Sequence, residues 1–191
     1  MKNNMDESSS ERREYFRVKD KAIINIKKVA PDQTLDTLML ENSTFLLGSA
    51  INALELDHQT TFSKIKRSDP AIALYLENIN KKINLIADYI IDNDSDMHNT
   101  SETNISLSAS GVAINTDKDF DQDDLILIKL LLLPEKKGIL CLGCIKRIKE
   151  INNKRTLCID FTEISESDRE LIIKHTITRQ LEEARDKKRT D

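Results

Sequence analysis

Three arginines near the start of the sequence could hold a phosphate-bearing ligand. Arg12, Arg13 and Arg17 lie close together, with Tyr15 and Phe16 between them. A guanidinium group carries its donors in a planar fork, so it can bind a phosphate or the O6/N7 edge of guanine through paired hydrogen bonds, and its face can stack on a base. The segment therefore predicts a nucleotide site. The alternative is a solvated arginine patch, which is common near a terminus.

A second segment, which runs Ser106-Leu-Ser108-Ala-Ser110-Gly111, could form the floor of the same site. In a strand, Ser106 and Ser108 project from one face, and their hydroxyl groups can donate and accept hydrogen bonds. Gly111 permits a turn and a close approach of the ligand. Arginines on a flexible segment could then fold over a ligand that lies on the serine face. The alternative is an ordinary turn, because Ser-Gly pairs are frequent there.

The elements that must position these residues follow from the apolar pattern. Period-two alternation and turn residues predict strands over residues 18–29, 104–108, 112–115, 125–133, 138–151 and 154–161. Apolar spacings of three and four predict a helix over residues 35–65, with a break near 42–44 or at Gly48, and a second helix from Pro70 to about residue 92 with Asp69 as its N-cap. A last helix over residues 165–188 has Ser167 as N-cap and Glu170 at the capping-box position.

This order predicts an α+β fold built on a small six-stranded antiparallel Greek-key barrel that is interrupted after its first strand. The sheet cannot close without residues 18–29, so residues 33–97 are predicted to be an inserted helical segment. The barrel and its C-terminal helix would then comprise residues 12–32 and 98–191, and residues 1–11 would be a flexible tail.

The second predicted helix carries a heptad repeat that indicates assembly. Its apolar side chains recur at alternating spacings of four and three, and this heptad stripe consists of Ile72, Leu76, Ile79, Ile83, Ile86 and Ile90. Isoleucine at both core positions, or leucine at a with isoleucine at d, disfavours parallel two-stranded coils and favours three or four strands. The alternative is a helix that packs on the first helix within the monomer.

The bulk composition disfavours polyanionic and membrane partners. The formal net charge is −4, so the chain lacks the basic field that non-specific binding to nucleic acid or anionic membranes needs. No apolar stretch approaches the ~20 residues of a membrane span, and the first residues lack the apolar core of a signal peptide. Three cysteines do not make a disulfide framework. We expect a cytoplasmic protein without nucleic-acid partners or membrane insertion.

Catalytic and metal-binding motifs are not evident, so we expect no enzyme activity, no cofactor and no metal. The sequence has no glycine-rich phosphate loop, no His-Glu-x-x-His and no nucleophile elbow. Cys141 and Cys144 form a Cys-x-x-Cys pair, but they lie inside a predicted strand, where these positions point to opposite faces. The acidic run from Asp117 to Asp124 lacks the glycine and the terminal glutamate of a calcium loop. A thiol-redox enzyme is an alternative that predicts a reactive pair at these cysteines.

Together, the two polar segments resemble the motifs of the PilZ family of cyclic di-GMP receptors. That family has an Arg-x-x-x-Arg motif just before a small antiparallel barrel, which Arg13 and Arg17 match, and Arg12 gives the doubled arginine often seen there. Its second motif, Asp/Asn-x-Ser-x-x-Gly, lies on a barrel strand and is matched by Ser108 and Gly111.

The resemblance implies a non-enzymatic receptor of bacterial second-messenger signalling with cyclic di-GMP as its ligand. Arg13 and Arg17 would hold phosphates and guanine edges, Arg12 would assist, and the Ser106–Gly111 segment would form the floor. Some family members carry inserted helices and form tetramers, which favours a homotetramer here, with a trimer or dimer as alternatives. Because Ser106 replaces the Asp or Asn of the second motif, a degenerate scaffold that does not bind the nucleotide is the main alternative.

Overall fold

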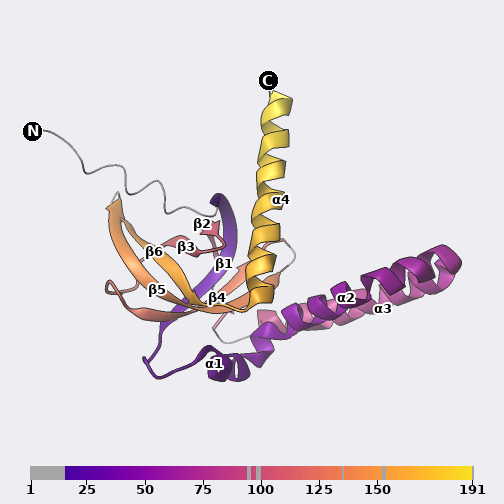
Figure 1. Ribbon diagram of the computed structural model, residues 1–191, viewed down its shortest axis with the longest axis horizontal. Coiled ribbons are helices and arrows are strands. Elements are labelled where there is room, and N and C mark those ends of the chain that lie inside the picture. The colour runs from indigo at the N-terminus through magenta and orange to yellow at the C-terminus, as the bar shows by residue number, and fades with distance from the viewer. Residues whose placement is uncertain (1–15, 94–95, 98–99, 135, 152–153, 191) are drawn as a thin grey trace, which may run out of the picture. The chain divides into compact units, whose positions relative to one another are not determined.

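The structure is a computed structural model that describes residues 16–190 apart from 94–95, 98–99, 135 and 152–153. The described chain forms β1 (Val18–Lys28), α1 (Leu35–Glu41), α2 (Ser43–Ser68), α3 (Pro70–Asp92), β2 (Glu102–Ser108), β3 (Gly111–Thr116), β4 (Leu125–Leu132), β5 (Lys137–Ile151), β6 (Lys154–Glu163) and α4 (Glu166–Thr190). The strands close into a barrel in the order β1-β2-β3-β6-β5-β4 (Figure 1). The predicted α+β fold with a six-stranded antiparallel barrel is confirmed.

The chain divides into two compact units, which we describe separately. The first comprises residues up to 20, 104–124 and 143–191, and the second comprises residues 21–103 and 125–142. The predicted division into tail, barrel and insertion separates a helical segment from the barrel sequence on either side of it, whereas the two units are groups of residues in mutual contact. The predicted boundaries therefore stay a prediction. The predicted tail, residues 1–11, lies outside the described residues.

The first unit is built on the β2–β3 hairpin and its pairing with β6. Val112 lies opposite Leu107 on one side and Ile159 on the other, and these three side chains are buried. Burying apolar side chains along one face of paired strands is the main source of stability of such a sheet. This packing fixes the register of the strand that carries the serine motif.

Helix α4 belongs to the first unit and begins differently from the prediction. The Ser165 Oγ atom accepts a hydrogen bond from the Asp168 backbone N–H at 3.1 Å, so Ser165 caps the helix. The capping box predicted at Ser167 and Glu170 is therefore wrong, because the helix begins at Glu166 and already includes Ser167.

The second unit contains the β1–β4 ladder and a core beneath α1. Inward positions pair along the ladder, such as Ile24 with Leu130 and Ile26 with Ile128. The core cluster joins the helical segment to the strands and contains Leu35, Leu38, Phe45, Met97, Leu127, Leu131, Leu140 and Leu142.

A buried lysine lies in the middle of this apolar ladder. The Lys129 side chain is 5% exposed, its Nζ atom lies 2.9 Å from Asp96 Oδ2, and it stands 5.6 Å from the centre of the Phe45 ring. An ammonium group can be buried at tolerable cost only with such partners. The charge inside the longest apolar run of the sequence is therefore a link between β4 and the segment that follows α3.

The predicted first helix is broken at Asn42, between α1 and α2, within one of the two regions where a break was expected. The Asn42 backbone N–H and side-chain amide both donate to the Leu38 carbonyl oxygen. The next turn agrees with the prediction: Asp69 Oδ1 accepts hydrogen bonds from the backbone N–H groups of Ala71 and Ile72, and Pro70 is the first residue of α3. Helices α2 and α3 consequently run side by side as a hairpin (Figure 1).

The helices also bear on the expected absence of a membrane span. Among the described residues, none of them combines the length and the hydropathy that crossing a bilayer requires.

Candidate functional site

The described part of the arginine motif begins at Phe16. Arg17 is exposed immediately before β1, and Phe16 beside it is 83% exposed. Arg12 and Arg13 lie outside the described residues. In the strand order of the barrel β1 is the neighbour of β2, the strand that carries Ser106 and Ser108. The fold thus brings the strand that follows the first motif beside the strand that holds the second.

The two serines of the second motif differ in their surroundings. Ser106 is half-buried, whereas Ser108 is fully buried. The Ser108 Oγ atom donates to the Gly111 carbonyl oxygen at 3.1 Å and lies 3.2 Å from the Ser110 Oγ atom. Ser106 is therefore partly open to solvent, while the hydroxyl group of Ser108 is used within the β2–β3 turn.

Gly111 is required by the neighbouring strand. A Cβ atom at this position would lie 2.2 Å from the Ile159 carbonyl oxygen of β6, far inside van der Waals contact. Gly111 pairs with Asp160 in the β3–β6 register, and the Phe161 backbone N–H donates to the Ser110 carbonyl oxygen at 3.0 Å. The predicted reasons for this glycine were a turn and the close approach of a ligand; the close approach of β6 is by itself a sufficient reason for a glycine here.

An arginine that the sequence did not single out holds the same turn. Arg169, in the first turns of α4, is half-buried, and its Nη1 atom donates to the Ala109 carbonyl oxygen at 2.9 Å. Ala109 is buried between the two ends of the turn, Ser108 and Gly111. Nothing in the local pattern of α4 distinguishes Arg169 from the charged residues around it, so this contact follows only from the tertiary structure.

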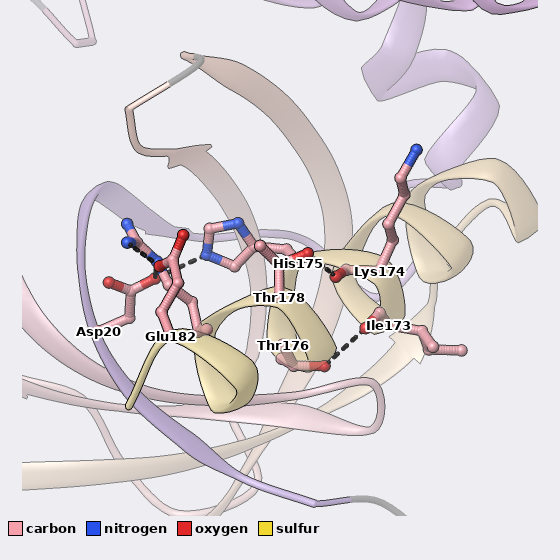
Figure 2. Close-up of polar contacts among 8 residues, drawn as sticks. Asp20, Ile173, Lys174, His175, Thr176, Thr178 and Glu182 are labelled. Atoms are coloured by element: carbon pink, nitrogen blue, oxygen red, sulfur yellow. Dashed lines mark hydrogen bonds and ion pairs between the residues drawn. The ribbon is translucent and has the colours of Figure 1, made fainter. Parts of the chain in front are cut away.

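A second contact of α4 reaches the beginning of β1. Figure 2 shows Asp20 and His175 facing one another, with His175 Nε2 2.6 Å from Asp20 Oδ2, and Arg179 Nε donates to the same oxygen at 3.0 Å. The side chains of Asp20 and His175 are each 10% exposed. A signal in the sequence existed: Asp20 occupies an inward position of β1, in line with Val18, Ala22 and the residues that follow at period two.

The neighbouring carboxylates stabilise the charged form of Arg179. Burial on its own lowers the pKa of Arg179, but the carboxylates of Glu182 and Asp20 outweigh it, so that the pKa is raised above its usual value. Arg179 Nη1 also lies 3.0 Å from Glu182 Oε2. The guanidinium group thus joins the strand carboxylate of Asp20 to the helix carboxylate of Glu182.

The heptad stripe of α3 is only partly buried within the chain. Ala73 and Ala87 are buried on α3, and Asn84 Nδ2 donates to Glu55 Oε1 of α2 at 3.3 Å. Within the stripe, Ile72, Ile83 and Ile86 are 52%, 42% and 61% exposed, and Leu76, Ile79 and Ile90 are half-buried. Successive residues of a helix are about 100° apart, so the alanine face and the centre of the stripe point in different directions.

The residues considered for metal or redox chemistry lie in β5 and in the loop between β3 and β4. Cys141 and Cys144 are not in a disulfide, and both are buried within β5. In the part of the chain that the structure describes, no group of three or more His, Cys, Asp or Glu side chains is placed to hold a metal ion. Arg155 of β6 holds the loop that carries the acidic run, with its Nη1 atom 2.6 Å from Asp119 Oδ1.

Comparisons with known proteins agree with this architecture. Residues 85–177 match the family model of the PilZ domain. A crystal structure of a Xanthomonas campestris protein, described as a new tetrameric PilZ domain self-assembled via an unusual helical bundle, is similar with a TM-score of 0.61 at 9% identity, over 90% of this chain and 89% of that one. The inhibitor of motility MotI/DgrA of Bacillus subtilis gives a TM-score of only 0.39 at 23% identity, over 44% of this chain and 43% of that one. No curated protein matches the chain.

The matched residues run from the second half of α3 through β2 to β6 and into α4. They include the second motif and most of the barrel, and the structural similarity at low identity supports the same fold for nearly the whole chain. PilZ domains form a family of cyclic di-GMP receptors that are generally not enzymes. The PilZ-family assignment that the two motifs predicted is thus supported by the match over residues 85–177 and by the similarity in fold.

Proposed function

We propose that this protein is a cyclic di-GMP receptor that assembles through α3. The observation that carries the binding part is the exposed Arg17 at the start of β1, the strand beside the Ser106–Gly111 strand. Arg17 with Arg13 would bind phosphates and guanine edges, Arg12 would assist by charge or stacking, and the half-buried Ser106 would offer its hydroxyl group to the ligand.

The assembly part rests on the heptad stripe. Three of its isoleucines, Ile72, Ile83 and Ile86, are exposed, although α3 also packs against α2. Exposed apolar side chains in a continuous row favour a protein contact. The Xanthomonas campestris protein is described as a tetrameric PilZ domain self-assembled via a helical bundle, which supports a homotetramer for this chain, here proposed to form through α3.

A second function is favoured by a different observation. The Ser108 hydroxyl group is fully buried and bonded to the Gly111 carbonyl oxygen, and Ser106 stands where the motif has Asp or Asn. Both facts suit a scaffold in which the turn is retained for folding and the nucleotide is no longer bound. In that case, the stripe would be the functional surface and the arginines would be solvated.

Calorimetric titration of the full-length chain with cyclic di-GMP separates the two functions. We expect saturable binding by the wild type and at least ~tenfold weaker binding by Arg17→Ala and by Arg13→Ala, because each loses a charge-assisted contact. Arg67→Ala is the matched control, since Arg67 is an exposed arginine in the last turn of α2. Absence of heat at high micromolar wild-type protein would exclude the receptor and leave the scaffold.

A further inference from the structure

Helix α4 contacts the turn of the second nucleotide motif and the strand that follows the first. Near its N-terminus Arg169 reaches the Ala109 carbonyl oxygen in the β2–β3 turn, and farther along His175 and Arg179 reach Asp20 in β1. We propose that α4 is a clamp that positions the two halves of the nucleotide site, with Arg169 and Asp20 as positioning residues. This inference deepens the proposed function and rests on it for its ligand.

The first contact fixes the turn. The Ala109 carbonyl oxygen lies between Ser108 and Gly111, and the guanidinium group of Arg169 donates to it at 2.9 Å. A hydrogen bond from a charged donor is stronger than one between neutral groups, and partial burial strengthens it further. The turn also binds β6 through the Ser110 carbonyl oxygen and the Phe161 N–H at 3.0 Å. The hydrogen bond of Arg169 therefore connects the turn to α4.

The second contact fixes the strand that follows the arginine motif. Asp20 comes three residues after Arg17, which is about 10 Å of extended chain. Its carboxylate is 10% exposed, and two of its partners, His175 and Arg179, come from α4. A shift of α4 would break both contacts at a largely buried carboxylate, which couples the position of α4 to the beginning of β1.

A consequence for signalling follows from reciprocity. If α4 sets the geometry of both halves of the site, a ligand that bridges them must in turn stabilise the contacts of α4. Ile177 and Leu181 of α4 are 52% and 55% exposed, so a change in the helix reaches a surface that other molecules can sense. Cyclic di-GMP binding would thus change the exposed surface of α4, and this surface would be a second route to a partner beside the assembly through α3.

The test uses the full-length chain in two measurements. The first is hydrogen exchange of the Ser106–Val112 peptide without nucleotide, in the wild type, Arg169→Gln, Arg169→Lys and Arg185→Gln. The clamp predicts faster exchange in Arg169→Gln, partial rescue in Arg169→Lys because an ammonium group can still donate, and no change in Arg185→Gln, an exposed arginine on α4. Asp20→Asn, which keeps a carbonyl oxygen but loses the charge, serves as a second variant.

The second measurement is titration with cyclic di-GMP. We expect Arg169→Gln and Asp20→Asn to bind about tenfold more weakly and the control to bind as the wild type does. We also expect the nucleotide to slow exchange around His175 and Arg179 in the wild type. Unchanged exchange in the turn of folded Arg169→Gln, or unchanged affinity in both variants, would overturn the clamp. A wild type that binds no nucleotide overturns the proposed function instead, and the clamp is then decided by the exchange of the free protein alone.

Discussion

The Ser108–Gly111 turn and the heptad stripe of α3 differ in how much of their chemistry a single chain uses. In the turn, the Ser108 hydroxyl group, the Gly111 backbone and the Ala109 carbonyl oxygen all have partners within the fold. In the stripe, Ile72, Ile83 and Ile86 remain exposed although the hairpin is complete. A residue whose type the fold already requires says little about a ligand, whereas apolar side chains that the fold leaves uncovered point to another molecule.

The largest expected effect is loss of assembly in Ile86→Asp. Ile86 is 61% exposed, so a carboxylate is tolerated within one chain but would be buried in a helical bundle. Leu85→Asp is the matched control, because Leu85 is 69% exposed on the same helix and lies about 100° farther round it. Light scattering should show a wild-type oligomer, a smaller species for Ile86→Asp and an unchanged oligomer for Leu85→Asp.

Two other outcomes would reassign this surface. Dissociation by Leu85→Asp alone would move the contact to the face that carries Leu74 and Leu85. A monomeric wild type would mean that the exposed isoleucines do not mediate self-association. The claim that uncovered apolar side chains point to another molecule would then be wrong for a second copy of this chain.

Gly111→Ala should have the next largest effect. The added Cβ atom would lie 2.2 Å from the Ile159 carbonyl oxygen, so β3 or β6 must shift, at a cost of about 3 kcal/mol in the free energy of unfolding. Gly138→Ala is the control, because its Cβ atom would approach the Phe45 carbonyl oxygen only to 3.1 Å and should cost less, about 1 kcal/mol. Urea denaturation measures both. Equal stability of Gly111→Ala and the wild type would mean that β6 does not require this glycine, and the approach of a ligand would again be its better explanation.

A smaller effect on stability is expected from Ser108→Ala. It removes the hydrogen bond to the Gly111 carbonyl oxygen, which should cost about 1 kcal/mol and leave nucleotide affinity unchanged if the turn alone uses this hydroxyl group. Ser106→Ala should do the opposite, because its hydroxyl group is half-buried on the strand and is the one proposed for the ligand. Denaturation and calorimetry on both variants would reveal whether the two serines have these separate roles.

The fold was largely predictable because strands and helices follow from the local periodicity of apolar residues. The inward residues Ala22, Ile24 and Ile26 indicated β1, and the Asp69-Pro70 pair fixed the start of α3. The site was predictable only as two motifs. The contact of Arg169 with Ala109 joins residues 60 positions apart, and that of His175 with Asp20 joins residues 155 positions apart, so no local pattern contains them. The burial of Ser108 likewise depends on what covers the outer face of β2.

The smallest effect is expected at the end of the hairpin, where Lys66 Nζ lies 2.9 Å from Glu77 Oε1. The hydrogen bond from Lys66 and its charge lower the pKa of Glu77 below its ordinary value. A carboxyl group with a lowered folded pKa stabilises the fold above the unfolded pKa, and this contribution is lost as the pH falls through the folded pKa. Because solvent screens both charges, Glu77→Gln should leave the denaturation midpoint at neutral pH unchanged and remove only a slight acid dependence.

The measurement is an NMR titration of the Glu77 carboxyl carbon, with Lys66→Gln expected to return its pKa towards the ordinary value and Lys64→Gln as the control. Lys64 is an exposed lysine on the same helix. An effect of Glu77→Gln on stability as large as that of Ser108→Ala would mean that the hairpin depends on its tip rather than on the buried Ala73 and Ala87. The ion pair between Lys66 and Glu77 would then set the orientation of the heptad stripe, and the exposure of the stripe would no longer indicate a protein partner.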